Sequence, residues 1–236
     1  MRKRFAIILS GIMMIAALSS CGKEDKKGST ESTTQKRTEA VTTEATTEPG
    51  DTPIATGTDA TSTDAIKNLM GYYKGNEYTN ELAGFKVKVN GHAWRFYSAA
   101  EVAAAAGVEE QEILDLWTGE KTPYDQNMSF CMIAGNKSTG SSIIISYYYV
   151  NNELNKDTSA EFYLEVAADQ IEGGEVKQIT FVDKDYYALV IPPEKEGGYE
   201  QVRYATKAGD LIIVISFTIG EGETIDVLET MFSPLK

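Results

Sequence analysis

Apolar and polar residues alternate along much of the chain after residue 70, with the period of two that marks a β-strand covered on one face. Phe85-Lys-Val-Lys-Val89 shows the pattern most clearly, because its apolar residues share one face and its lysines share the other. Two longer segments, 142–150 and 211–219, are apolar on both faces. A strand of that kind must be covered on both sides. We therefore expect a central sheet between two covering layers.

Helix-start signals separate the predicted strands. Ser98-Ala-Ala-Glu101 and Thr158-Ser-Ala-Glu161 have the spacing of capping boxes, and glycines follow both segments at Gly107 and Gly173. We expect further helices over 109–117 and 224–232, and one or two helical turns over 64–70. The other strands are expected over 72–74, 77–79, 94–97, 128–134, 176–182, 185–191 and 199–206.

Short turns such as Gly75-Asn76 and Asp183-Lys184 join most of these strands, which favours hairpins over parallel crossovers. The predicted fold class is therefore α+β, a mainly antiparallel sheet with helices on both faces (an α/β/α sandwich).

The order of these elements carries a resemblance. Tyr78-Thr-Asn80, Gly84-Phe-Lys-Val-Lys-Val89 and Trp94-Arg-Phe96, followed by strands, a helix, a meander and a last helix, resemble PsbP/Mog1-like domains over 71–232. The chain has Gly91-His92-Ala93 where such domains often place a proline before the tryptophan. The resemblance implies an antiparallel sheet sandwiched by helices, and a noncatalytic module that assists or docks onto other proteins.

The start of the chain follows a different pattern. Met1-Arg-Lys-Arg4 is basic, and 5–18 is an uncharged apolar run that would be about 21 Å long as a helix. A bilayer core is about 30 Å thick, so the run suits a secretory signal better than a membrane span. Leu18-Ser19-Ser20-Cys21 then resembles the lipobox of bacterial lipoproteins.

That resemblance implies recognition by the signal peptidase through Leu18, Ser19 and Ser20, cleavage before Cys21, and lipid attachment to Cys21. We therefore expect an extracytoplasmic protein on the outer face of the cell membrane, or on the outer membrane if the host has two. An ordinary signal peptide and an uncleaved helix remain the alternatives.

Three regions follow from these patterns: a signal peptide over 1–20, a lipidated Cys21 with a tether up to 64, and a single α+β domain over 65–236. The tether is rich in Thr, Glu, Lys and Ser and has no aromatic residue, so it cannot bury enough apolar surface to fold. It is interpreted as a disordered spacer or, alternatively, as a glycosylated stalk through the cell wall.

The chain is strongly acidic, with 35 Asp and Glu against 22 Lys and Arg and a net charge of −13. This balance argues against nucleic acid as a partner, since binding phosphate backbones needs clustered cations. It also argues against direct adsorption to anionic lipid. The expected partners are the membrane, reached through the lipid on Cys21, and a protein of the cell envelope.

No motif for catalysis, a metal or a cofactor is predicted. His92 is the single histidine and lies in a turn, while Cys131 lies in an apolar strand and is interpreted as a buried, inert thiol. Two acidic runs are interpreted as solvated helix faces rather than as cation sites: Glu161, Glu165 and Asp169, and Glu109, Glu110, Glu112 and Asp115. Paired carboxylates for glycoside hydrolysis remain open, because their pairing is spatial.

The 13 tyrosines and two tryptophans are the remaining candidates for recognition. We interpret them mainly as sheet cover, with a binding surface at a sheet rim as the alternative. The function predicted is a lipid-anchored, noncatalytic interaction or accessory domain, which should expose an apolar or aromatic patch of a few hundred Å². The alternatives are a lipoprotein that binds a sugar or peptide and, third, a cell-wall hydrolase.

Overall fold

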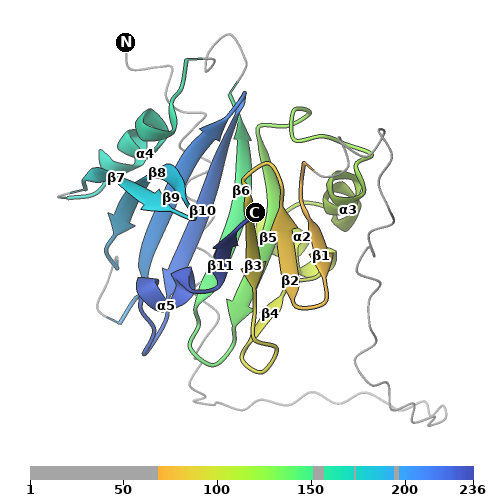
Figure 1. The fold of residues 1–236 in the computed structure, drawn as a ribbon, viewed down its shortest axis with the longest axis horizontal. Coiled ribbons are helices and arrows are strands. Elements are labelled where there is room, and N and C mark those ends of the chain that lie inside the picture. The colour runs from red at the N-terminus through yellow and green to blue at the C-terminus, as the bar shows by residue number, and fades with distance from the viewer. Residues whose placement is uncertain (1–68, 151–156, 173, 194–196) are drawn as a thin grey trace, which may run out of the picture.

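The computed structural model describes residues 69–150, 157–172, 174–193 and 197–236 (Figure 1). The predicted signal peptide, Cys21, the predicted tether and most of the helical turns expected over 64–70 lie outside these residues. The described part of the chain forms two antiparallel sheets with helices packed around them. The predicted α+β class, built mainly from antiparallel strands, is therefore confirmed.

The smaller sheet has four strands in the order β1-β2-β3-β11. β1 (Tyr72–Lys74) and β2 (Glu77–Asn80) form the predicted hairpin across Gly75-Asn76. β2 pairs with β3 (Phe85–Lys88), and β3 pairs with β11 (Phe232–Pro234). This sheet therefore joins the start of the described chain to its end.

The larger sheet has seven strands in the order β4-β5-β6-β10-β9-β8-β7. In chain order these are β4 (Trp94–Phe96), β5 (Met128–Asn136), β6 (Ser142–Tyr149), β7 (Val176–Phe181), β8 (Lys184–Ile191), β9 (Glu200–Ala208) and β10 (Leu211–Ile219). The two strands predicted to be apolar on both faces, β6 and β10, lie near its centre. Ile145 and Ile215 face the smaller sheet, while Ile144 and Val214 face the helices.

The helices divide between the two faces of the larger sheet. α2 (Ala99–Ala106) and α3 (Glu110–Thr118) pack on β5, and α4 (Ala160–Ala168) packs on β7, β8 and β9. α5 (Ile225–Glu229) lies on the opposite face, where Leu228 joins the core between the two sheets. Helices thus lie on both faces, as predicted. Most of the cover on the α5 side is the smaller sheet, which the sequence analysis did not anticipate.

The last element corrects a prediction, because the helix expected over 224–232 stops at Glu229 and the chain continues into β11. Phe232 is 8% exposed, and its ring lies 5.3 Å from that of Phe85 between centroids. The Lys88 N–H donates to the Met231 carbonyl at 2.9 Å. Burial of one aromatic ring and pairing with β3 therefore end the helix early.

Two details at element ends are also corrected. The β7–β8 hairpin turns at Val182 and Asp183, both with positive φ (47° and 61°), rather than at Asp183-Lys184. Two successive positive φ values are typical of the type I′ turn, whose twist suits a two-residue hairpin. α4 is capped by Ser159, whose hydroxyl accepts from the Phe162 N–H, and not by Thr158.

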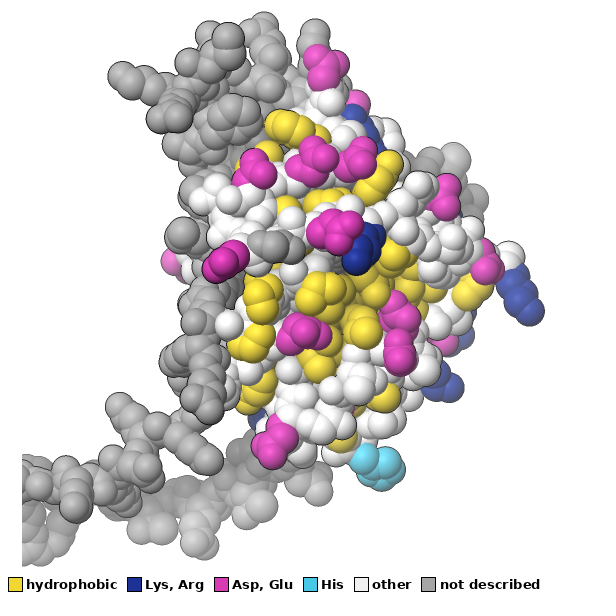
Figure 2. All heavy atoms as spheres, turned by 90° about the vertical axis from the view of Figure 1, so that its left-hand side faces the viewer, with side chains coloured by type: hydrophobic (Ala, Val, Ile, Leu, Met, Phe, Trp, Pro, Cys, Tyr) yellow, Lys and Arg dark blue, Asp and Glu magenta, His cyan; other side chains and the backbone are white. Residues whose placement is uncertain are grey.

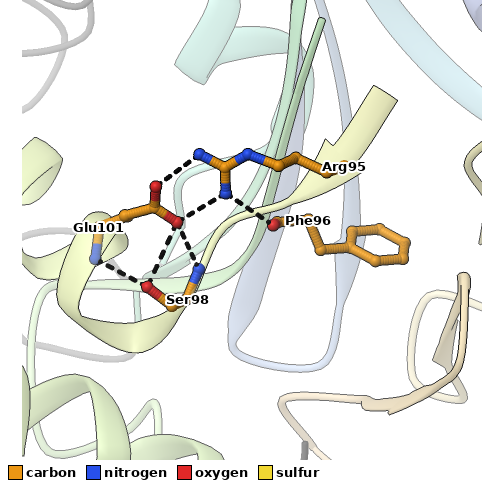
Figure 3. Close-up of polar contacts among 4 residues, drawn as sticks. All are labelled: Arg95, Phe96, Ser98 and Glu101. Atoms are coloured by element: carbon orange, nitrogen blue, oxygen red, sulfur yellow. Dashed lines mark hydrogen bonds and ion pairs between the residues drawn. The ribbon is translucent and has the colours of Figure 1, made fainter. Parts of the chain in front are cut away.

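The predicted capping box of α2 is confirmed, and an arginine extends it (Figure 3). The Ser98 hydroxyl accepts from the Glu101 N–H at 3.3 Å, and the Ser98 N–H donates to the Glu101 carboxylate at 3.0 Å. Arg95 of β4 donates to both oxygens of that carboxylate, Nη1 to Oε2 at 2.7 Å. The hydrogen bond from Arg95 is the main reason that the pKa of Glu101 falls to about 2. The start of α2 is thereby tied to β4.

A buried polar network joins the two sheets. Asn80 of β2 is fully buried, and its Nδ2 donates to the Tyr78 hydroxyl at 2.9 Å. Its Oδ1 accepts from the Tyr147 hydroxyl of β6 at 2.8 Å and from the Ala83 N–H at 2.9 Å. Tyr78 in turn donates to the Met70 carbonyl at 2.6 Å. Each of these buried groups therefore has a partner, which is what a core requires of them.

Candidate functional site

The structure places His92 and Cys131, the two residues weighed for catalysis, in a turn and in the core. His92 is exposed in the turn between β3 and β4. Cys131 of β5 is fully buried, and burial raises the pKa of its thiol well above the ordinary value. A thiol in that state is a poor nucleophile, because the thiolate is the reactive form. The interpretation of Cys131 as a buried thiol is confirmed.

The acidic residues lie on helix surfaces. Glu161, Glu165 and Asp169 are exposed along α4, and Glu109 and Glu110 are exposed at the start of α3. Over the described ranges, no group of three or more His, Cys, Asp or Glu side chains is placed to hold a metal ion. Within the same ranges, no helix is long and apolar enough to cross a membrane.

The aromatic residues mostly build the core, as the main interpretation held. Tyr78, Tyr147 and Tyr186 are fully buried. Phe181 contacts Tyr204 and Phe232 with ring centroids 5.2 and 5.0 Å apart, so rings from both sheets form one cluster. Such edge-on ring pairs add stability beyond the area they bury. These side chains are consequently not available at a binding surface.

A cleft of about 330 Å³ opens beside α5, between the ends of the two sheets. Asn136 and Glu223 line it, and Asn136 Nδ2 donates to Glu223 Oε1 at 3.0 Å. The other carboxylate oxygen of Glu223 is buried and has no hydrogen-bond partner among the residues described. Trp94 also lines the cleft but is only 2% exposed, so its ring offers no open face on which a sugar could stack.

A second feature is an apolar patch at the β7 side of the larger sheet. The patch lies on the face of the larger sheet that the smaller sheet covers in its central part. It consists of Ile179 of β7 and of Ala188 and Val190 of β8, and Val190 is 51% exposed. We call these three residues the edge patch. Figure 2 looks at this side of the molecule and shows apolar side chains gathered in the middle, with Asp and Glu around them and a Lys or Arg beside them.

The edge patch adjoins an open strand edge. Within the described chain β7 pairs only with β8, so one side of β7 has no strand beside it. Exposed apolar patches rimmed by polar residues are typical of protein-binding surfaces. An exposed apolar patch is expected from the sequence, but its position is not. The alternation of Tyr186, Ala188 and Val190 predicts that this face of β8 is covered along its whole length.

Comparisons with known proteins gave distant structural likenesses. No family model matches the chain, and no curated protein matches its sequence. The chain is similar to a solved protein from Bacteroides thetaiotaomicron VPI-5482, with 12% identity and a TM-score of 0.37, over 70% of this chain and 50% of that one. It therefore spans about half the length of that protein.

The chain is also similar to cyanobacterial PsbP (CyanoP) from Synechocystis sp. PCC 6803, with 10% identity and a TM-score of 0.37, over 70% of this chain and 98% of that one. Because a fold does not determine a function, the site has to be interpreted from its own residues.

Proposed function

We propose that the protein is a lipid-anchored, extracytoplasmic module that binds an envelope protein through the edge patch and catalyses no reaction. The observation that carries this proposal is the half-exposed Val190, which shares its face of β8 with Ala188 near the open edge of the larger sheet. Apolar surface exposed to water is unfavourable in free energy, so a partner that covers this surface gains the free energy of removing it from water.

The charges around the edge patch indicate which surface charge a partner would need. The chain carries a net charge of −13, and acidic side chains predominate around the apolar centre in Figure 2, although Lys177 of β7 lies opposite Ala188. The complementary surface is an apolar ridge flanked by Lys and Arg. Charge pairs at the rim of an interface act mainly on the association rate and on specificity, so we expect association to slow as salt rises.

A crosslinking experiment in intact host cells tests the interface. A photoreactive residue at Val190 should give one main adduct with an envelope protein. The matched control is Val108, which is 37% exposed between α2 and α3 and away from the edge patch. Binding of the purified partner should weaken at least tenfold in Val190→Glu and stay unchanged in Val108→Glu. Equal adducts from both positions, or none from either, would contradict the proposal.

The anchor is tested separately, because it rests on the sequence of residues 1–21. Mass spectrometry of the mature protein should find diacylglycerol on an N-terminal Cys21. Cys21→Ser should release the protein from the membrane fraction. An unmodified Cys21 or a retained leader would remove the anchor from the proposal but leave the edge patch untouched.

Binding of a sugar or peptide is the second candidate, and the cleft beside α5 supports it. The unpaired oxygen of Glu223 and the Asn136 amide could hold a polar ligand there. We rank this function second because the cleft has only the buried Trp94 as an aromatic wall.

A further inference from the structure

An arginine is buried in the larger sheet without an acidic partner. Arg203 of β9 is 5% exposed, and its Nε is buried with no hydrogen-bond partner. In the ranges that the structure describes, its guanidinium makes neither a hydrogen bond nor an ion pair with a side chain. The guanidinium of an arginine carries its positive charge even in a protein interior. A buried cation that lacks a partner strongly favours the binding of an anion.

Two more buried polar groups lie on the same face of neighbouring strands. Ser216 of β10 is directly opposite Arg203, and Ser146 of β6 is opposite Val214, two residues along β10. The Ser216 hydroxyl has no hydrogen-bond partner among the residues described, whereas the Ser146 hydroxyl lies beside that of Tyr148 and lowers its pKa by hydrogen bonding. Buried polar groups are nearly always paired in native proteins, so the unpaired Arg203 Nε and Ser216 Oγ on adjacent strands favour the binding of a polar ligand between them.

Two tyrosines border this surface. Tyr148 of β6 and Tyr163 of α4 have their ring centroids 4.8 Å apart. Burial raises the pKa of both hydroxyls. Their hydrogen bond to each other lowers the pKa of Tyr148 and raises that of Tyr163, and the charge of Arg203 lowers both. At neutral pH both tyrosines are therefore protonated.

We propose that Arg203 and Ser216, bordered by Ser146, Tyr148 and Tyr163, form a binding site for a small oxyanion, a carboxylate or a phosphate group. The guanidinium supplies a fork of N–H donors that matches two oxygens of either group. The hydroxyls supply further donors, and the low local dielectric strengthens each bond. The site lies on the helix side of the larger sheet, whereas the edge patch lies on the opposite face.

Thermal unfolding and calorimetry of the full chain test the site, with sodium phosphate, sodium acetate and sodium chloride compared at equal ionic strength. Phosphate or acetate should raise the Tm above its value in chloride, and the better of the two identifies the oxyanion class. Ser216→Ala keeps the charge but removes one donor, so the Kd of that anion should rise roughly tenfold. Arg203→Met should abolish the effect of the anion.

The Tm of Arg203→Met in chloride alone shows whether Arg203 serves to bind an anion or to stabilise the fold. In chloride, Arg203→Met should match or exceed the Tm of the parent protein, because it removes an uncompensated buried charge. Lys177→Met is the control for lost charge, since Lys177 is exposed and pairs only with Glu175. The proposal is overturned if neither anion raises the Tm of the parent protein, or if Arg203→Met retains the anion effect. A large loss of stability in chloride for Arg203→Met overturns it as well.

Discussion

Removing the Asn80 side chain should weaken the attachment of the smaller sheet to the larger one. Asn80 is fully buried and makes three hydrogen bonds, to the Tyr78 and Tyr147 hydroxyls and to the Ala83 N–H, at 2.8–2.9 Å. Asn80→Ala deletes all three and leaves no polar atom in their place. The Tyr147 hydroxyl keeps its second bond, to the Leu69 carbonyl at 2.8 Å, but the Ala83 N–H loses its acceptor.

The magnitude follows from these contacts. A typical buried hydrogen bond contributes about 1 kcal/mol net, and an unsatisfied buried donor costs about 1–3 kcal/mol. Two lost bonds to hydroxyls and one orphaned Ala83 N–H together give about 3–5 kcal/mol. Since a domain is stable by only about 5–15 kcal/mol, the variant should fold but lie close to its stability limit.

Urea unfolding followed by tryptophan fluorescence measures the effect, with Asn76→Ala as the matched control. Asn76 makes a single side-chain bond, to the Val89 carbonyl at 2.8 Å, and is exposed, so its loss should cost less than about 1 kcal/mol. The urea dependence of the free energy of unfolding should stay unchanged in both variants. A loss below about 1.5 kcal/mol for Asn80→Ala, or one equal to the control, would refute the reasoning.

Three further outcomes are expected. The pKa of Glu101 is lowered from 4.5 to about 2 in the folded protein, so its pair with Arg95 stabilises the fold above about pH 4.5 and this stabilisation is lost as the pH falls toward 2. In urea titrations, Glu101→Gln should lower the free energy of unfolding by about 1 kcal/mol at pH 6. Near pH 2 the free energies of unfolding of the variant and the parent protein should be equal. Asp183→Gly should stabilise the fold by about 0.5 kcal/mol and so raise the Tm, because glycine tolerates the φ of 61° in the turn. An unchanged or lower Tm would contradict this. The Cys131 thiol should react with a thiol reagent only as fast as the protein unfolds, so fast labelling of the native protein would contradict its burial.

The central strands were predictable because their sequence alone reports burial on each face. In β10, Leu211 and Ile213 alternate with Ile212 and Val214, and the structure places the first pair toward the smaller sheet and the second toward α4. A period of two in the apolar residues identifies a covered face of a strand, whether a helix or a second sheet covers it. The α2 cap was predictable for a similar reason, since its contacts are local in sequence.

The covering layers were less predictable because they depend on pairing over long distances. Phe232–Pro234 spans three residues and ends in a proline, so it has no strand signature of its own. It becomes a strand because β3 offers an open edge and Phe85 offers an aromatic contact. The edge strand β4 lies close to β3 in sequence, yet it pairs with β5 in the other sheet.

The surroundings of the site residues could not be predicted from the sequence. Arg203 shares one face of β9 with Gln201, Ala205 and Lys207, so alternation assigns it to a solvated face. Its burial, and whether an acidic side chain lies within reach, are decided by tertiary packing, which one sequence does not reveal. Val190 is the opposite case, because alternation assigns it to a covered face and the structure exposes it.

Both proposed sites have one structural cause, which is that the covering layers are narrower than the seven-stranded sheet. On one face the smaller sheet covers one end of β7 and β8, where Phe181 contacts Phe232, and leaves Val190 exposed at the other end of β8. On the other face α2 and α3 pack on β5 while α4 packs on β7 to β9, so Ser146 and Ser216 lie on the strands between the two helical layers. A fully covered sheet needs only apolar residues on its faces. Arg203 lies on β9, which α4 covers, directly opposite Ser216 of β10. The proposed anion site therefore lies at the border of the α4 layer, where Arg203 Nε and the Ser216 hydroxyl have no hydrogen-bond partner among the residues described.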